Sequence, residues 1–281
     1  MERRSSGPLV WNQWRNENNI LCVELLEGFL SDNEVEKLRA EFLDDSSYEF
    51  LITEDCNVYL PPQDSVFDMF APEKDPEREL AERLFMAFRK GVFPSDLCRE
   101  AYEGLKGAAR ASKNRGVAGG KVDPKKMGRD GATLVPVGDG TRARYITKDG
   151  ILSDTVEANI TMGGIAGFFP GTARNPYVRK TAYTRDHWET FQRAWPFLQK
   201  SAEIFRELNP LRYAAQQGFV ENHQLDENGW VIPGTPYSTI TVNKNFQTAC
   251  HQDAGDLKAG FENFSVLEAG PHDYKGSYTV F

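Results

Sequence analysis

The residues best suited to chemistry in this sequence are a histidine and an aspartate two positions apart, His251 and Asp253. They follow a stretch in which Ile240 and Val242 alternate with polar residues, the period-2 pattern of a half-buried strand. Side chains two apart on a strand share a face, so we expect the imidazole and the carboxylate to converge on one point inside a barrel mouth. His-x-Asp is two thirds of the 2-His-1-carboxylate triad that binds Fe(II) and leaves three coordination positions open. The alternative is a histidine at a strand end beside a surface aspartate.

The run from Thr241 to Phe261, which contains this pair, resembles the TET/JBP family. The members of that family are Fe(II)- and 2-oxoglutarate-dependent dioxygenases that oxidise the 5-methyl group of pyrimidine bases in nucleic acid. Similar segments lie upstream, at 166–169 and 181–185, and downstream, at 264–268 and 276–281. The resemblance covers the chain from about residue 105 to its end.

This resemblance implies a site and a reaction. His251 and Asp253 would be the metal ligands and the catalytic residues, Fe(II) and 2-oxoglutarate the cofactors, and O2 and DNA containing 5-methylpyrimidines the partners. Oxidative decarboxylation of 2-oxoglutarate to succinate would be coupled to hydroxylation of the methyl group of 5-methylcytosine or thymine. If the strand is regular, Asn243 and Asn245 share the face of the two ligands, and one of them is a candidate for binding the co-substrate or the base.

The family pattern is incomplete in this sequence. In the family, the second iron-binding histidine and the basic residue that anchors the far carboxylate of 2-oxoglutarate lie on later strands, whereas the sequence given stops at Phe281. The one histidine after Asp253 is His272, which is either the third ligand or an exposed turn residue. We therefore expect a missing C-terminal segment or a second chain to complete the barrel.

A basic stretch precedes this region. It is rich in glycine, contains one acid, Asp123, and carries eight cationic residues: Lys106, Arg110, Lys113, Arg115, Lys121, Lys125, Lys126 and Arg129. The composition predicts a flexible segment that is either a solvated connector or an arm that contacts phosphates. The resemblance favours the nucleic-acid-binding interpretation. The stretch has no aromatic residue, so it cannot stack bases.

Charge and composition exclude several classes of protein. A net charge of −8 does not fit a chain that coats nucleic acid uniformly, although it allows a local basic surface. The sequence has no apolar run long enough to span a bilayer and no signal peptide, so we expect an intracellular protein, in cytoplasm or nucleus, without a membrane partner. The four cysteines form no Cys-x-x-Cys pair and suggest neither a disulfide framework nor a zinc site.

The expected fold is α+β, with a double-stranded β-helix, a jelly-roll-like dioxygenase core, of which this chain holds the first strands. We divide it into an N-terminal helical and strand support region (1–105), the basic flexible segment (106–130) and the first part of the core (131–281). The N-terminal packing helices are expected to begin near Ser31, at Pro76 and near Ser95. In the first of them, Val35, Leu38 and Phe42 should form the buried stripe. The second helix is expected to continue through Phe88 to Gly91.

Two further elements are expected in the core. A glycine-rich strand lies within 158–171, where the backbone of another strand or a ligand can approach closely. Phe168 and Phe169 on it either pack in the core or stack on a flipped base. A long aromatic helix follows, capped by Thr184, interrupted at Pro196 and stopped at Asn209.

Three functions remain open on the sequence. The first is the dioxygenase acting on a 5-methylpyrimidine in DNA. The second is a dioxygenase of the same class that hydroxylates a protein side chain or a small metabolite, and the third is a truncated, non-catalytic nucleic-acid-binding remnant. Neutralising the basic stretch separates the first from the second, because only phosphate contacts depend steeply on salt.

Overall fold

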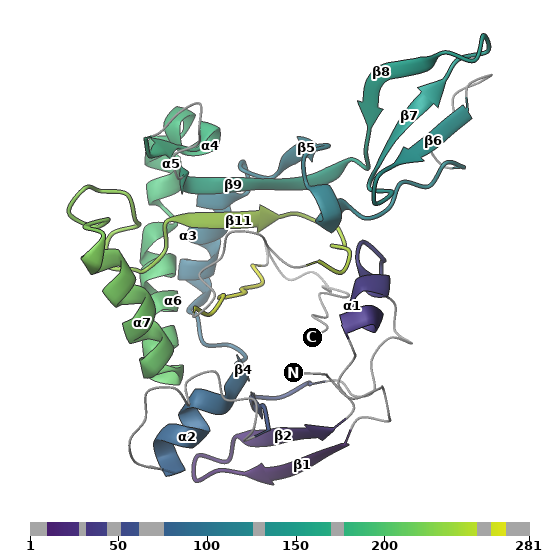
Figure 1. Ribbon diagram of the computed structural model, residues 1–281. Helices are drawn as coiled ribbons and strands as arrows, with labels where there is room; N and C mark the ends of the chain where they lie inside the picture. The colour runs from purple at the N-terminus through teal and green to yellow at the C-terminus, as the bar shows by residue number, and fades with distance from the viewer. Residues whose placement is uncertain are drawn as a thin grey trace.

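The computed structural model describes residues 10–27, 32–43, 52–61, 76–125, 133–169, 177–251 and 260–267. Its elements, in chain order, are β1 (Val10–Arg15), β2 (Leu21–Glu27), α1 (Asp32–Leu38), β3 (Cys56–Tyr59), α2 (Pro76–Arg83), β4 (Leu84–Phe88), α3 (Ser95–Leu105), β5 (Arg110–Ser112), a 3-10 helix (Gly116–Gly119), β6 (Thr133–Val137), β7 (Arg142–Ile146), β8 (Leu152–Glu157), β9 (Thr161–Phe169), β10 (Arg179–Lys180), α4 (Ala182–Asp186), α5 (Trp188–Gln192), α6 (Trp195–Leu208), α7 (Pro210–Asn222) and β11 (Thr239–Asn243). Within the described part of the chain, the strands form three separate sheets (Figure 1).

The first sheet has the strand order β1-β2-β3-β4 and lies apart from the others, at the bottom of Figure 1. The β2–β3 pair is parallel and the other two pairs are antiparallel. Alternate residues bury opposite faces of the sheet: Cys22 packs with Tyr59 and Leu84, whereas Cys56 packs with Val23. The N-terminal region, where we expected strands as well as helices, therefore has a sheet of its own.

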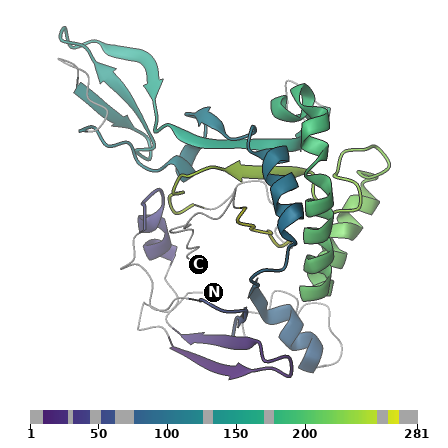
Figure 2. The ribbon, with the colours of Figure 1, turned by 180° about the vertical axis from the view of Figure 1, so that it is seen from behind.

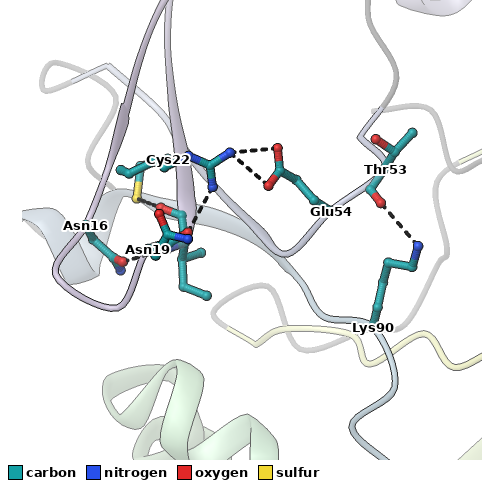
Figure 3. A network of polar contacts seen from close by, with 8 residues as sticks. Asn16, Asn19, Cys22, Thr53, Glu54 and Lys90 are labelled. Atoms are coloured by element: carbon teal, nitrogen blue, oxygen red, sulfur yellow. Dashed lines mark hydrogen bonds and ion pairs between the residues drawn. The ribbon is translucent and has the colours of Figure 1, made fainter.

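Polar contacts tie the ends of this sheet together (Figure 3). Arg15 donates to both carboxylate oxygens of Glu54, at 3.0 and 2.9 Å, and to the carbonyl of Asn19 at 2.9 Å. Lys90 donates to the carbonyl of Thr53 at 3.2 Å. These contacts hold together, at one end of the sheet, the turn after β1, the residues before β3 and the residues after β4.

The second sheet, called here the β9 sheet, contains β5, β9, β10 and β11. β9 is its centre: β11 pairs antiparallel along one edge, with Thr239 opposite Gly167 and Asn243 opposite Gly163, and β5 and β10 pair along the other. Helices α3 and α6 cover one face (Figure 2). The core there includes residues from both helices, from α5, from β9 and from the loop before β11: Ala101, Leu105, Ala166, Phe191, Phe197, Leu198 and Ile232.

Glycines allow the backbone to pass very close to β9. A Cβ atom at Gly164 would lie 1.9 Å from the carbonyl oxygen of Ala108, and one at Gly167 would lie 2.2 Å from that of Ser238. Gly167 also has a φ of +108°, which residues with a Cβ rarely adopt. The expected close approach of another strand to this glycine-rich segment is confirmed.

The helical layer begins at Thr181 and not at Thr184. The Thr181 hydroxyl accepts a hydrogen bond from the Thr184 N–H, and Thr184 is fully buried, where its hydroxyl accepts from the Gly167 N–H at 2.7 Å. The expected cap at Thr184 was wrong because that hydroxyl bonds to the sheet. Pro196 lies in the first turn of α6, as a restart requires, and Asn209 both ends α6 and caps α7, a helix that we did not expect.

Two expectations for the N-terminal helices were wrong. The helix that starts at Pro76 ends at Arg83, because Leu84–Phe88 instead pairs with β3 as β4. In α1, Val35 is 43% exposed, so it does not make the buried stripe that helical spacing suggested. Ser31, the expected cap of α1, lies outside the described residues.

The third sheet is the antiparallel meander β6-β7-β8, which projects away from the rest of the molecule (Figures 1 and 2). Its small core is Val122, Leu134, Ala143 and Tyr145. At its base, the Asn159 side-chain amide donates to the carbonyls of Gly119, Gly120 and Lys121 at 2.9, 3.3 and 3.0 Å.

The α+β class is confirmed by these helices and antiparallel sheets. The jelly-roll core stays a prediction. No helix in the described ranges has both the length and the apolar character to cross a bilayer.

Candidate metal site

The strand that leads to the candidate ligands ends earlier than expected. β11 stops at Asn243, and Asn245 has a φ of +48°, in the left-handed region, so the chain turns out of the sheet. Asn243 and Asn245 therefore do not share a strand face, and His251 lies on an irregular loop. The expectation of one regular strand through His251 was wrong because this left-handed residue breaks the alternation.

His251 is partly buried, and its ring is oriented by a local hydrogen bond. Nδ1 lies 2.7 Å from the carbonyl oxygen of Ala249. A carbonyl can only accept, so this contact requires the proton on Nδ1, the tautomer in which Nε2 is the nitrogen able to bind a metal. A backbone carbonyl that fixes one ring nitrogen in this way is the usual support of a metal-binding histidine.

Backbone hydrogen bonds hold the His251 loop between two distant segments. The Ala249 N–H donates to the carbonyl of Ala118 at 3.0 Å, in the 3-10 helix. The Cys250 N–H donates to the carbonyl of Glu41 at 2.9 Å, and the Cys250 carbonyl accepts from the Ala40 N–H at 2.8 Å. The loop is thus fixed by residues after α1 and after β5, which the sequence did not single out, since they carry no chemically distinctive side chain.

The other proposed ligand, Asp253, lies outside the described residues, as does His272. Among the residues that the structure does describe, no group of three or more His, Cys, Asp or Glu side chains lies close enough to hold a metal ion. His251 fits one coordination position of an Fe(II) site, because a neutral imidazole with Nε2 as acceptor is a suitable ligand. The described residues therefore include one candidate ligand, His251.

The cysteines are poor candidates for ligands. All four are free, and Cys22 and Cys56 are buried. Burial raises the pKa of the Cys56 thiol to about 11, so it stays protonated at neutral pH.

Asn243 is linked to the basic stretch. Its Oδ1 accepts a hydrogen bond from Nη2 of Arg115 at 3.2 Å. Gly163, opposite Asn243 on β9, leaves the space: a Cβ there would lie 3.1 Å from Asn243 Oδ1 and 3.3 Å from Arg115 Nε. A candidate residue for cofactor binding and a candidate for nucleic-acid binding therefore meet on the sheet, a pairing that sequence spacing does not reveal.

The basic stretch contains regular secondary structure where it is described. Residues 106–125 include β5 and the 3-10 helix, and the small residues Ala108, Ala109 and Ala118 are buried among the neighbouring elements. Burial of these side chains offsets the loss of conformational entropy when a glycine-rich segment takes up one backbone conformation. Lys126 and Arg129 lie outside the described residues.

Several of the basic side chains have acidic partners within the chain. The ion pairs are Lys106–Glu103 at 2.6 Å, Lys113–Glu157, and Lys121–Glu41 at 2.5 Å. Arg110 contacts His187, with Nη2 at 3.2 Å from Nε2. Three of the described cations in this stretch therefore have a glutamate partner inside the chain.

Two further aromatic rings, those of His223 and Phe168, have structural roles. His223 ends α7 and stacks on Phe219 with ring centroids 4.1 Å apart. Phe168 is 6% exposed and meets Trp188 edge-on, so it packs in the core and does not stack on a flipped base.

Part of the chain is similar to known oxygenases. Residues 164–279 match the family model Tet_JBP, described as the oxygenase domain of the 2OGFeDO superfamily. The chain is 33% identical to thymine dioxygenase JBP1 of Crithidia fasciculata over 117 residues, which are 41% of this chain and 13% of that protein. It is 31% identical to thymine dioxygenase JBP1-B of Trypanosoma cruzi over 156 residues, which are 55% of this chain and 18% of that protein.

The matched part of the chain thus spans less than a fifth of the length of either relative. No solved structure matches. The matched residues include most of β9, the helices α4 to α7, β11 and the His251 loop.

Proposed function

Residues 164–279 match the Tet_JBP oxygenase family, and from that premise we propose that the chain is part of an Fe(II)- and 2-oxoglutarate-dependent dioxygenase that oxidises the 5-methyl group of a pyrimidine in DNA. The relatives are named thymine dioxygenases, which favours thymine over 5-methylcytosine. The observation that supports the proposal is the orientation of the His251 ring: Nδ1 contacts the Ala249 carbonyl oxygen at 2.7 Å, and we take Nε2 as the ligand nitrogen.

In this proposal, His251 and Asp253 hold the iron. Bound iron with 2-oxoglutarate and O2 would supply the oxidation of the methyl C–H bond. The chain itself orients the His251 ring through Ala249 and keeps the loop in place through Ala118 and Glu41. Asn243, held by Arg115, is the proposed polar contact for co-substrate or base on the exposed end of β11.

DNA contact is proposed for the basic stretch, with its residues in unequal roles. Lys106, Lys113 and Lys121 already pair with glutamates, so phosphate would have to compete with those partners. Arg110 and Lys125 are exposed and have no acidic side chain within ion-pair distance among the described residues. We therefore assign the main phosphate contacts to Arg110 and Lys125.

The metal site is tested by anaerobic titration of the 281-residue chain with Fe(II) and 2-oxoglutarate, with the visible charge-transfer band of the chelate as the readout. We expect a band in the wild type that is lost in His251→Ala. The matched control is His223→Ala, which removes an exposed histidine from the end of α7 and should leave the band unchanged.

A band that persists in His251→Ala, or that disappears equally in His223→Ala, would contradict the assignment of His251. The absence of a band in the wild type would mean that this chain alone is not the enzyme. Succinate formation with thymine-containing and 5-methylcytosine-containing duplexes then identifies the base, through a hydroxyl group added to one nucleoside and not to the other.

DNA binding is tested by the salt dependence of the affinity. The double variant Arg110→Gln, Lys125→Gln should weaken binding to duplexes of any sequence and reduce the slope of log K against log[salt] by about 2, roughly one per phosphate contact. Lys200→Gln on α6, an exposed lysine paired with Glu203, is the control and should leave the slope unchanged. A slope unaffected by the double variant, with turnover of a protein or small metabolite, would support the alternative hydroxylase.

A further inference from the structure

Ala40 holds an unusual backbone conformation next to the His251 loop. Its φ is +64°, in the left-handed region that alanine rarely adopts, and it is only 2% exposed. A residue keeps such a conformation only where its surroundings determine it. The surroundings here are the 3-10 helix segment and the loop that carries His251.

Both polar backbone groups of Ala40 are used, each by a different segment. The N–H donates to the Cys250 carbonyl at 2.8 Å, and the carbonyl accepts from the Lys121 N–H at 3.1 Å. The next residue continues the contact, because the Glu41 carbonyl accepts from the Cys250 N–H at 2.9 Å and its carboxylate pairs with Lys121 Nζ at 2.5 Å. The left-handed turn lets consecutive residues face residues 121 and 250 at once.

This contact fixes the peptide plane that precedes His251. The Cys250 carbonyl and the His251 nitrogen belong to one planar peptide group, so the bond from the Ala40 N–H restricts its rotation. Rotation of that plane would move the imidazole of His251 away from the Ala249 carbonyl. The hydrogen bond to that carbonyl sets the tautomer of the ring.

We propose that Ala40 is a positioning residue for the metal ligand His251, acting through the Cys250 peptide. The proposal rests on the proposed function in one respect, that His251 binds the metal. It assigns a role in the metal site to a residue outside 164–279, the part of the chain that matches the oxygenase family.

The test compares three substitutions in the full chain. Ala40→Val disfavours the left-handed conformation and crowds a buried site, whereas Ala40→Gly adopts a positive φ freely and is the conservative rescue. Gln224→Val is the matched control: its φ is +53°, it is exposed, and it lies just beyond the end of α7. It applies the same backbone strain away from the His251 loop.

The first readout is the ¹⁵N NMR signature of the His251 ring in the metal-free chain, which reports whether Nδ1 carries the proton. The second is the affinity for Fe(II) in the presence of 2-oxoglutarate. We expect Ala40→Val to lose the Nδ1–H signature and to weaken Fe(II) binding about 10-fold or more, as loss of an outer support of a ligand does. Ala40→Gly and Gln224→Val should match the wild type in both.

The proposal is overturned if folded Ala40→Val keeps both the ring signature and the affinity, or if Gln224→Val changes them equally. If Ala40→Val does not fold, Phe42→Ala replaces it. Phe42 is 47% exposed and its ring occupies the place that a Cβ of Gly120 would take, so truncation loosens the packing of the segment that follows Ala40 against residue 120 with little loss of core. A retained ring signature in that variant overturns the proposal, and a lost one supports it.

Failure of the proposed function gives a different result. If the wild-type chain binds no Fe(II), this chain alone is not the enzyme, yet the ring signature in the metal-free chain still decides whether Ala40 orients His251.

Discussion

Tyr237 illustrates how strongly the fold changes the chemistry of a single side chain. It packs against the core between the β9 sheet and its helices. Burial raises the pKa of its phenol from 10.0 to about 12. The folded chain therefore holds the Tyr237 proton at a pH at which the unfolded chain has released it.

This pKa shift predicts an alkaline loss of stability. Below pH 10 Tyr237 is protonated in both the folded and the unfolded state, and its full contribution to the free energy of unfolding is present. As the pH rises from 10 to about 12, the folded state binds more protons than the unfolded state, so the free energy of unfolding falls. The slope from this residue is at most about 1.4 kcal/mol per pH unit. Urea unfolding between about pH 8 and pH 11 should show a flatter decline in Tyr237→Phe than in the wild type. Tyr177→Phe, at a site 61% exposed, should follow the wild type, and an equal flattening there would contradict the assignment.

At the scale of residues, the sequence indicates candidate metal ligands but not the residues that orient them. His251 was recognisable because its residue type and spacing to Asp253 are properties of the chain. The hydrogen bond to Ala249 and the contact with Ala40 depend on a loop and a left-handed turn that form only when distant segments meet. Alanine carries no chemical signal, so no motif could have pointed to Ala40.

At the scale of elements, the packing around β9 depends on glycines that let other segments pass close to its backbone. Gly164 has no room for a methyl group, because the carbonyl of Ala108 occupies its place at 1.9 Å. Gly218, in α7, has no atom within 4 Å of the corresponding position. Two glycines in regular structure therefore respond to the same substitution in opposite directions.

We predict that Gly164→Ala lowers the free energy of unfolding by about 1–3 kcal/mol or more, because the crossing segment must shift. Gly218→Ala should raise it by about 0.5–1 kcal/mol, because alanine is the better helix former. Chemical denaturation monitored by circular dichroism measures both. A neutral Gly164→Ala would show that the 107–109 segment can move away from β9 at little cost.

Elements were predictable where local signals agree with tertiary contacts. The strand at 239–243 and the helix start at Pro76 follow from alternation and from proline placement. The switch from α2 to β4 at Leu84 did not, because pairing with β3 overrides the helical periodicity of the same residues. The helix α7 was missed because Asn209-Pro210 was interpreted only as the end of the preceding helix. The same pair also starts a helix, with Asn209 as its cap and Pro210 in its first turn.

At the scale of the whole molecule, the region that matches the oxygenase family depends on residues before it. β9 pairs with β5, its helical face is covered partly by α3, and the His251 loop is bonded to residues 40–41 and 118. Arg212 of α7 also senses Glu82 of α2: burial lowers the pKa of the Arg212 guanidinium, and the charge of Glu82 partly opposes that shift. The sequence predicted the α+β class, but not the division into three sheets, since that follows from long-range pairing.

The meander β6-β7-β8 leaves and re-enters the molecule at a single place, where the Asn159 amide bonds the carbonyls of residues 119 to 121. Its two ends are thus already closed by the body of the protein, whatever lies between them. We therefore expect changes in length at the tip of the meander to be tolerated while β5 and β9 keep their pairing.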